Sequence, residues 1–134
     1  ENGVADAEDV LRSSYLIEHL RAVAKAVRDR IPVAGYFAWT LTDNLEWSDG
    51  YGAQFGFVGV DRNTMARMKR PSFSVFKKII SSREITVSDG DQAWQKVIVR
   101  QGKFRNYCRA DDGITPIASK DKRKYSKKDW RFTD

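Results

Sequence analysis

Residues 32–47 read PVAGYFAWTLTDNLEW, and this stretch decides the fold class. The run from Val33 to Leu41 is apolar on both faces and rich in β-branched and aromatic residues, and it lies between Pro32 and the polar pair Asp43-Asn44. A short apolar run with such boundaries is typical of a strand that is covered on both faces, as in a parallel sheet. We therefore predict a fully buried parallel strand over residues 33–41.

An amphipathic helix is predicted before this strand, between Asp9 and Arg30. Its apolar residues recur every three or four positions and form one stripe: Leu16, Leu20, Val23, Val27 and Ile31. The acidic residues Asp6, Glu8 and Asp9 at its start complement the helix dipole, and Pro32 stops the helix. Because its other faces are polar, we expect it on the outside of the fold.

Two further helices are predicted after the strand. Phe57 to Val60 form a short apolar stretch that ends in a turn at residues 61–63, and Pro71 is well placed in the first turn of a helix. The apolar side of that helix consists of Phe73, Phe76, Ile79 and Ile80. Residues 88–99 predict one more helix, packed by Trp94 and Val97. The order of elements indicates an α/β chain of one and a half βα units, too few to cover the central strand alone.

Charge divides the chain into two parts. Residues 1–99 contain 13 Lys/Arg and 13 Asp/Glu, whereas residues 100–134 contain 11 and 5, so the net charge of +6 lies in the last 35 residues. Such a basic tail would attract anionic lipid headgroups or nucleic acid, and a solvated surface extension explains it equally well. No apolar run approaches the roughly 20 residues that span a bilayer. The single cysteine, Cys108, excludes an internal disulfide and a cysteine zinc cluster.

Two acidic motifs are candidates for a site. One lies before the first predicted helix, and the other directly follows the predicted strand. Glu1 opens the motif Glu-Asn-Gly, and a carboxylate and amide cluster with tryptophans follows the strand: Trp39, Asp43, Asn44, Glu46 and Trp47. The carboxyl ends of parallel strands meet on one face, so both motifs would lie there. Tryptophan beside carboxylate and amide is a sugar-binding combination. The alternative, in which the tryptophans are core and Glu46 is a solvated loop charge, is equally consistent with these residues.

The motifs resemble those of glycoside hydrolase family 1. ENG at 1–3 is similar to the family's TENG motif, YLIEHLRAV at 15–23 to its following helix, and residues 32–61 to its last barrel strand and sugar-clamping loop. The similarity covers residues 1–82 without a gap. It implies the C-terminal portion, from the end of strand 7 to helix 8, of a (β/α)8 TIM barrel, with residues 83–134 as a basic, partly irregular C-terminal extension.

The resemblance also implies roles for individual residues. Glu1 matches the nucleophile that forms a covalent glycosyl-enzyme. The substrate-binding positions would be Asn2, Trp39, Glu46, Trp47 and Phe55, with no metal ligand among them. The family further implies a cis peptide bond between Trp39 and Thr40. Its acid/base glutamate belongs to an Asn-Glu-Pro motif that does not occur in this chain, so we expect the chain to be part of a longer enzyme and inactive alone.

The tail narrows the resemblance within the family. Residues 85–94 (ITVSDGDQAW), 102–112 (GKFRNYCRADD) and 129–132 (DWRF) resemble the extension of the plant galactolipid:galactolipid galactosyltransferases, a group associated with freezing tolerance. Residues 113–128 depart from that pattern, being shorter and more lysine-rich. The resemblance implies galactosyl transfer between galactolipids, with hydrolysis of β-glucosides or β-galactosides as the alternative reaction. An inactive fragment or a lipid-binding module is the alternative of another class.

The same resemblance implies surroundings and partners. It predicts a glycoside or galactolipid substrate, contact of residues 100–131 with a membrane surface at the chloroplast outer envelope, and no nucleic acid. No cofactor is visible in the sequence, although the galactosyltransferase resemblance admits a divalent cation such as magnesium. The oligomeric state stays open.

Overall fold

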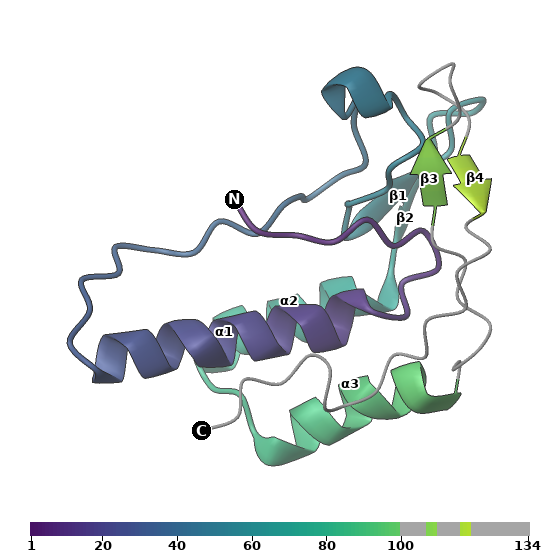
Figure 1. Ribbon diagram of the computed structural model, residues 1–134. Coiled ribbons are helices and arrows are strands. Elements are labelled where there is room, and N and C mark those ends of the chain that lie inside the picture. The colour runs from purple at the N-terminus through teal and green to yellow at the C-terminus, as the bar shows by residue number, and fades with distance from the viewer. Residues whose placement is uncertain (100–106, 110–115, 119–134) are drawn as a thin grey trace.

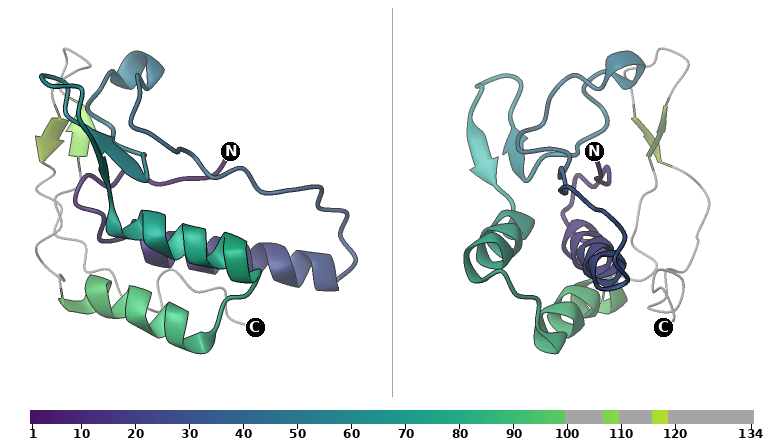
Figure 2. Two further views of the ribbon diagram at one scale, coloured as in Figure 1. Left: turned by 180° about the vertical axis from the view of Figure 1, so that it is seen from behind. Right: turned by 90° about the vertical axis from the view of Figure 1, so that its left-hand side faces the viewer.

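The computed structural model describes residues 1–99, 107–109 and 116–118 of the chain. Its elements in chain order are α1 (Arg12–Arg28), a 3-10 turn (Trp47–Asp49), β1 (Val58–Val60), β2 (Arg67–Lys69), α2 (Pro71–Ser82), α3 (Val87–Val99), β3 (Tyr107–Arg109) and β4 (Pro116–Ala118). Figure 1 shows α1 and α2 side by side and α3 running beneath them in the opposite direction. Seen end-on in Figure 2, α1 and α2 lie side by side with α3 below them, and the extended segments lie on the other side of α1 and α2; we call the three helices together the helix layer.

Helix α1 confirms the first predicted helix, with both ends set by local geometry. Asp9 has a φ of 55°, in the left-handed region, so the helix begins after it, at Arg12. Asp6 Oδ2 accepts hydrogen bonds from the backbone N–H groups of Leu11 (2.7 Å) and Arg12 (3.0 Å). These donors have no partner within a helix, so the carboxylate caps it as the sequence predicted. The helix ends before Arg30, which is also left-handed (φ 61°).

The hydrophobic core lies under the N-terminal half of α1. Leu16 and Ile17 are buried against Phe57, Ile79 and Ala93, which come from the other elements. The predicted stripe is therefore buried only in part, because its last members, Val27 and Ile31, are exposed.

Helix α2 begins at Pro71, the first helical position, as predicted. Phe76 stacks on Phe57 with ring centroids 4.9 Å apart, which joins α2 to the start of β1. The helix ends at Arg83, whose φ of 55° places it in the left-handed conformation typical of helix ends. Ile80, expected on the packed side, is exposed.

Helix α3 packs against α1 through Trp94 and Val97, as predicted. The Trp94 side chain is 2% exposed, and its indole N–H donates to Glu18 Oε1 at 3.0 Å. Thr86 and Asp89 cap the helix reciprocally: Asp89 Oδ2 accepts from the Thr86 backbone N–H (2.9 Å), and the Asp89 N–H donates to Thr86 Oγ1 (3.2 Å). Lys78 of α2 also donates to Asp89, at 2.5 Å.

The central segment departs from its prediction. Residues 33–41 form no regular strand and are not buried; Phe37 is 74% exposed. A strand needs neighbours along its whole length, and the described residues supply them only for its second half. Two isolated parallel bridges are present there, Asn2 with Ala38 and Thr42 with Val58.

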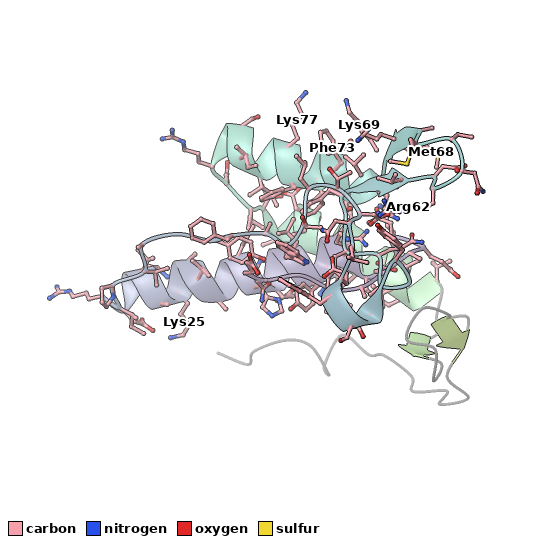
Figure 3. The ribbon with its side chains drawn as sticks, turned by 90° about the horizontal axis from the view of Figure 1, so that it is seen from above. Lys25, Arg62, Met68, Lys69, Phe73 and Lys77 are labelled. Atoms are coloured by element: carbon pink, nitrogen blue, oxygen red, sulfur yellow. The ribbon has the colours of Figure 1, made fainter. Side chains whose placement is uncertain are left out.

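A β-hairpin that the sequence did not predict follows the central segment. β1 and β2 pair antiparallel, with Gly59 opposite Met68. The predicted turn between them is present, since Asp61 Oδ1 accepts from the N–H groups of Asn63 (2.8 Å) and Thr64 (3.0 Å). β2 is only three residues long (Arg67-Met68-Lys69) and all three are exposed, so a single apolar residue between two cations was too little to mark it as a strand. In Figure 3 Lys69 lies near Phe73 of α2, and its ammonium is 5.0 Å from the Phe73 ring centroid.

A buried carboxylate and two arginines join the helix ends. Asp9 accepts from the Ser72 hydroxyl (2.5 Å) and N–H (2.7 Å), and from Arg12 Nη1. Nη2 of Arg12 donates to the backbone oxygens of Asp6 (2.6 Å) and Gln54 (2.8 Å). Burial removes water from both groups and disfavours their charged forms, which lowers the pKa of Arg12 and raises the pKa of Asp6.

The second arginine, Arg70, continues this chain of contacts into the loop before β1. Its two Nη atoms donate to the two carboxylate oxygens of Asp43 at 3.0 and 2.8 Å, and Nη2 also donates to Gln54 Oε1 at 2.7 Å. Asp43 Oδ1 accepts from the Gly56 N–H at 2.8 Å. We call Asp9, Arg12, Gln54, Arg70 and Asp43 the arginine network.

No helix among the described residues is long and apolar enough to cross a bilayer. The predicted contacts of the basic tail, residues 100–131, lie outside the described residues except for the backbone of β3 and β4. Cys108 lies in β3, opposite Ile117 of β4.

We predict that Asp43→Asn destabilises the complete protein by about 3–5 kcal/mol, because it leaves the Arg70 charge buried without its counterion. The side chains of Arg70 and Asp43 are 11% and 6% exposed. Urea unfolding measures the loss. The control is Asp29→Asn, which breaks the Lys25 pair whose side chains are 54% and 51% exposed and should cost less than about 1 kcal/mol. Equal losses in the two variants would contradict the prediction.

We also predict an acid-sensitive contribution from Asp89. The Lys78 ammonium, and then the Thr86 cap, lower the pKa of Asp89 from 3.8 to about 2. A lowered folded-state pKa stabilises above the unfolded value and is lost as pH falls through the folded value. Asp89→Asn should therefore lower the melting temperature near neutral pH, and the difference should vanish near pH 2. Glu84→Gln, whose side chain has no hydrogen bond to a described residue, is the control, and a constant difference at all pH values would refute this assignment.

Candidate active site

The Glu-Asn-Gly motif lies directly against the central segment. The Asn2 N–H donates to the Phe37 carbonyl oxygen at 2.9 Å, and the Trp39 N–H donates to the Asn2 carbonyl oxygen at 2.8 Å. Gly3 is in still closer contact, because a Cβ on it would lie 1.9 Å from the Trp39 carbonyl oxygen. Only glycine fits there. The backbone pairing of Asn2 with the central segment brings the two acidic motifs together. Glu1 precedes Asn2 and is exposed.

Trp39 and Glu46 form the polar centre of the candidate site. The Trp39 indole N–H lies 3.1 and 3.2 Å from the two carboxylate oxygens of Glu46. Both side chains are partly buried, so an incoming molecule could still reach them. The peptide bond between Trp39 and Thr40 is cis, which confirms the expectation from the family resemblance.

The two other aromatic candidates differ in placement. Trp47 opens the 3-10 turn and is 91% exposed; its carbonyl oxygen accepts from the Gly50 N–H at 3.2 Å, and its indole makes no hydrogen bond to a described residue. Phe55 is partly buried, and its carbonyl oxygen lies 3.4 Å from the Thr40 N–H, so it pairs with the central segment. The structure thus gathers Glu1, Trp39 and Phe55 around one segment and leaves Trp47 at its outer edge.

Asp43 is a buried structural residue and not one of the exposed or partly buried residues of the cluster. Both of its carboxylate oxygens are occupied by Arg70, and they also accept backbone N–H groups from Gly56 and Val60. The side chain is buried and its oxygens are paired, so Asp43, a member of the cluster that follows the central segment, has a structural role, and it is not among the substrate-binding positions that the family resemblance implies. Its counterion, Arg70, lies 27 positions later in the chain, and no sequence pattern indicates that these two residues pair.

Two tyrosines at the site were missed by sequence reasoning. The Tyr36 hydroxyl donates to Asn2 Oδ1 at 2.8 Å, and Asn2 Nδ2 donates to the Tyr15 hydroxyl at 3.3 Å. His19 packs on Tyr15 with ring centroids 3.9 Å apart, and its Nδ1 lies 2.8 Å from the Tyr15 carbonyl oxygen. His19 is therefore a packed helical histidine. The tyrosines lay within apolar patterns, and only their hydroxyl groups could have signalled a polar role.

The arrangement combines the exposed carboxylate of Glu1, the indole ring of Trp39 and the carboxylate of Glu46, which can accept hydrogen bonds from hydroxyl groups. An aromatic face covers the C–H face of a sugar ring, and carboxylate oxygens bind its hydroxyls. Among the described residues, no three His, Cys, Asp or Glu side chains come together in a way that could hold a metal ion. The geometry is suited to binding a sugar beside Glu1.

Comparison with known proteins identifies the family. The sequence pattern of "Glycosyl hydrolase family 1" matches residues 1–85. The chain is 43% identical to "Galactolipid galactosyltransferase SFR2, chloroplastic" from Arabidopsis thaliana and 41% identical to "Beta-glucosidase-like SFR2, chloroplastic" from Oryza sativa subsp. japonica. Each match covers 98% of this chain and 22% of the relative. A β-galactosidase from Pyrococcus woesei is 41% identical over 64% of the chain.

Solved structures show the same relationship. A β-glucosidase from Pyrococcus furiosus matches with a TM-score of 0.66 and 43% identity, over 72% of this chain and 21% of that one. Its family has the (β/α)8 barrel fold. The chain thus spans about a fifth of the length of the relatives it matches. From its sequence motifs, the parallel contacts of its first residues and these matches, we conclude that the chain belongs to glycosyl hydrolase family 1.

Proposed function

We propose that this chain is part of an enzyme that transfers a galactosyl group between galactolipids through a covalent intermediate on Glu1. One observation supports transfer above the family's other reactions. The similarity to the galactolipid galactosyltransferase covers 98% of the chain, whereas the similarity to the P. woesei β-galactosidase covers 64%. The additional coverage includes residues beyond the family pattern, which ends at residue 85.

The proposed fold of the whole protein is a (β/α)8 barrel, of which residues 1–82 supply the end of strand 7 through helix 8. The parallel bridge between Asn2, at the end of the proposed strand 7, and Ala38 of the central segment supports this placement, since neighbouring barrel strands are parallel. In such a barrel α1 and α2 would be outer helices, and residues 83–134 an extension whose first helix, α3, packs on α1.

The proposed chemistry is double displacement. The Glu1 carboxylate attacks the anomeric carbon while the bond to the leaving group breaks, and a carboxylic acid elsewhere in the whole protein protonates that group. The second carboxyl group, now a carboxylate after protonating the leaving group, takes the proton of an acceptor hydroxyl. The acceptor oxygen then displaces Glu1 from the anomeric carbon and forms the new glycosidic bond. Trp39 and Phe55 would line the sugar site, and Glu46 and Trp47 would bind its outer hydroxyls. Since the second carboxyl group is not assigned to this chain, we propose that the chain alone is inactive.

Hydrolysis is the second candidate, supported by the β-galactosidase and β-glucosidase relatives. The first half of the reaction would be the same, and water would replace the lipid-linked acceptor. Measuring how much labelled galactose appears in galactolipid products and how much as free sugar distinguishes the two reactions. Free galactose as the main product would reject transfer and leave the role of Glu1 intact.

The proposed location is the chloroplast outer envelope, in line with the word "chloroplastic" in the names of both plant relatives. There the basic residues 100–131 would contact the membrane surface and no nucleic acid. The described part of the site contains no cluster of metal ligands. A divalent cation such as magnesium would therefore act elsewhere in the whole protein. We assign it no step.

We predict that Glu1→Ala in the complete enzyme lowers turnover by about four orders of magnitude or more, because no covalent intermediate can form. Azide should restore reaction of an activated galactoside, since the small anion fits where the carboxylate was, and the product should be a galactosyl azide of inverted configuration. Mass spectrometry and NMR of the product check this. Glu8→Ala, at an exposed residue of the same segment, should leave turnover unchanged. Full transfer activity in Glu1→Ala would disprove the assignment.

We predict that Glu46→Gln lowers kcat/KM for galactosides by about 10- to 100-fold, since a charge-assisted hydrogen bond to a sugar hydroxyl is replaced by a neutral one. A 4-deoxy or 6-deoxy substrate, which lacks the bonded hydroxyl, should lose little further activity with the variant. Steady-state kinetics with both substrates measures the coupling. Independent, multiplicative losses would show that Glu46 does not bind these hydroxyls.

A further inference from the structure

Asn2 is held on every side by hydrogen bonds. Its backbone N–H and carbonyl oxygen bond to Phe37 and Trp39, and its side chain bonds to Tyr36 and Tyr15. The Asn2 side chain therefore has little freedom to turn toward a substrate, although the family resemblance suggested a substrate contact. A residue fixed in this way is suited to positioning its neighbour.

The tyrosines connect Asn2 to two separate elements. Tyr36 comes from the central segment, three residues before Trp39, and Tyr15 comes from the first turns of α1. Tyr15 is held in turn by the packing of His19 one helical turn later. The side chain of Asn2 thus ties the Glu-Asn-Gly motif both to the site and to the helix layer.

The hydrogen bonds have a defined direction. Burial, and secondarily the neighbouring Tyr15, raises the pKa of Tyr36 to about 12, so its hydroxyl stays protonated wherever an enzyme works. It can donate to Asn2 Oδ1 at all these pH values. In the structure the amide nitrogen of Asn2 is oriented toward Tyr15, whose hydroxyl oxygen accepts from it.

We propose that Tyr36 and Tyr15 are positioning residues that, through the Asn2 side chain, hold the Glu1 carboxylate at the distance and angle needed to attack the anomeric carbon. This inference rests on the proposed nucleophilic role of Glu1 and adds residues that touch neither substrate nor reacting atoms. Gly3 supports it from the other side, because its contact with the Trp39 carbonyl leaves the motif no room to shift toward the central segment. Catalysis is sensitive to displacements of about 1 Å, so a loosened Asn2 should slow attack while sugar binding persists.

The test uses the complete enzyme with Tyr36→Phe, which keeps the ring and removes the hydroxyl. A 2-deoxy-2-fluoro-galactoside with a good leaving group traps the covalent intermediate, and mass spectrometry measures the labelling rate of the Glu1 peptide. We expect labelling and kcat to fall about tenfold, with KM for the donor unchanged within about twofold. Tyr51→Phe, at an exposed tyrosine whose ring lies under Arg62, is the matched control and should label at the unsubstituted rate.

Variants at Asn2 separate positioning from a structural role. Asn2→Ala should slow labelling as much as Tyr36→Phe, and the double variant should be no slower than either single variant, since both break the same connection. If Tyr36→Phe does not fold, Tyr15→Phe supplies the same readout. Labelling at the unsubstituted rate in folded tyrosine variants, or a change in melting temperature alone, would overturn the inference and leave Glu1 as nucleophile. No label on Glu1 in the unsubstituted enzyme would overturn the proposed function and this inference together.

Discussion

The arginine network is the constraint on which the rest of the structure depends. Asp9 lies at the start of α1 and accepts from Ser72 at the start of α2, so one carboxylate fixes two helices relative to each other. Arg12 and Arg70 then meet at Gln54, one on its backbone oxygen and the other on its side-chain oxygen. The loop before β1 is therefore attached to the helix layer at the point where the helices begin.

The arginine network makes one arrangement of the helices and the loop before β1 specific. Burying charges is unfavourable unless each is paired and hydrogen-bonded, and replacing a buried ion pair by apolar residues is often neutral for stability. Its geometry, however, tolerates few alternatives, because the two oxygens of Asp43 and the two Nη atoms of Arg70 match only in one orientation. The apolar contacts of Phe57 with Phe76 supply attraction without such direction.

The site is positioned from the same frame. The loop attached at Gln54 continues to Phe55, whose carbonyl pairs with Thr40 beside Trp39. On the opposite side of Trp39, the Glu-Asn-Gly motif is fixed by backbone pairing and by the tyrosine contacts of Asn2. Trp39 is thus held between two segments that are far apart in the chain, and its indole is left to meet Glu46.

The sequence by itself determined that three helices form, that acidic residues such as Asp6 stabilise the start of α1, that Pro71 opens α2, and the family to which the motifs belong. These features depend on neighbours within a few positions or on the order of residues in a motif, and both can be read from a single chain. The structure alone decided which charged residues are structural, that Asn2 lies between two tyrosines, and where β2 pairs. The first two depend on partners far apart in sequence, 34 positions for Tyr36 and Asn2 and 63 for Asp9 and Ser72. The central segment shows the same limit, because its apolar pattern predicts a buried strand, whereas burial and pairing depend on which neighbours lie beside it.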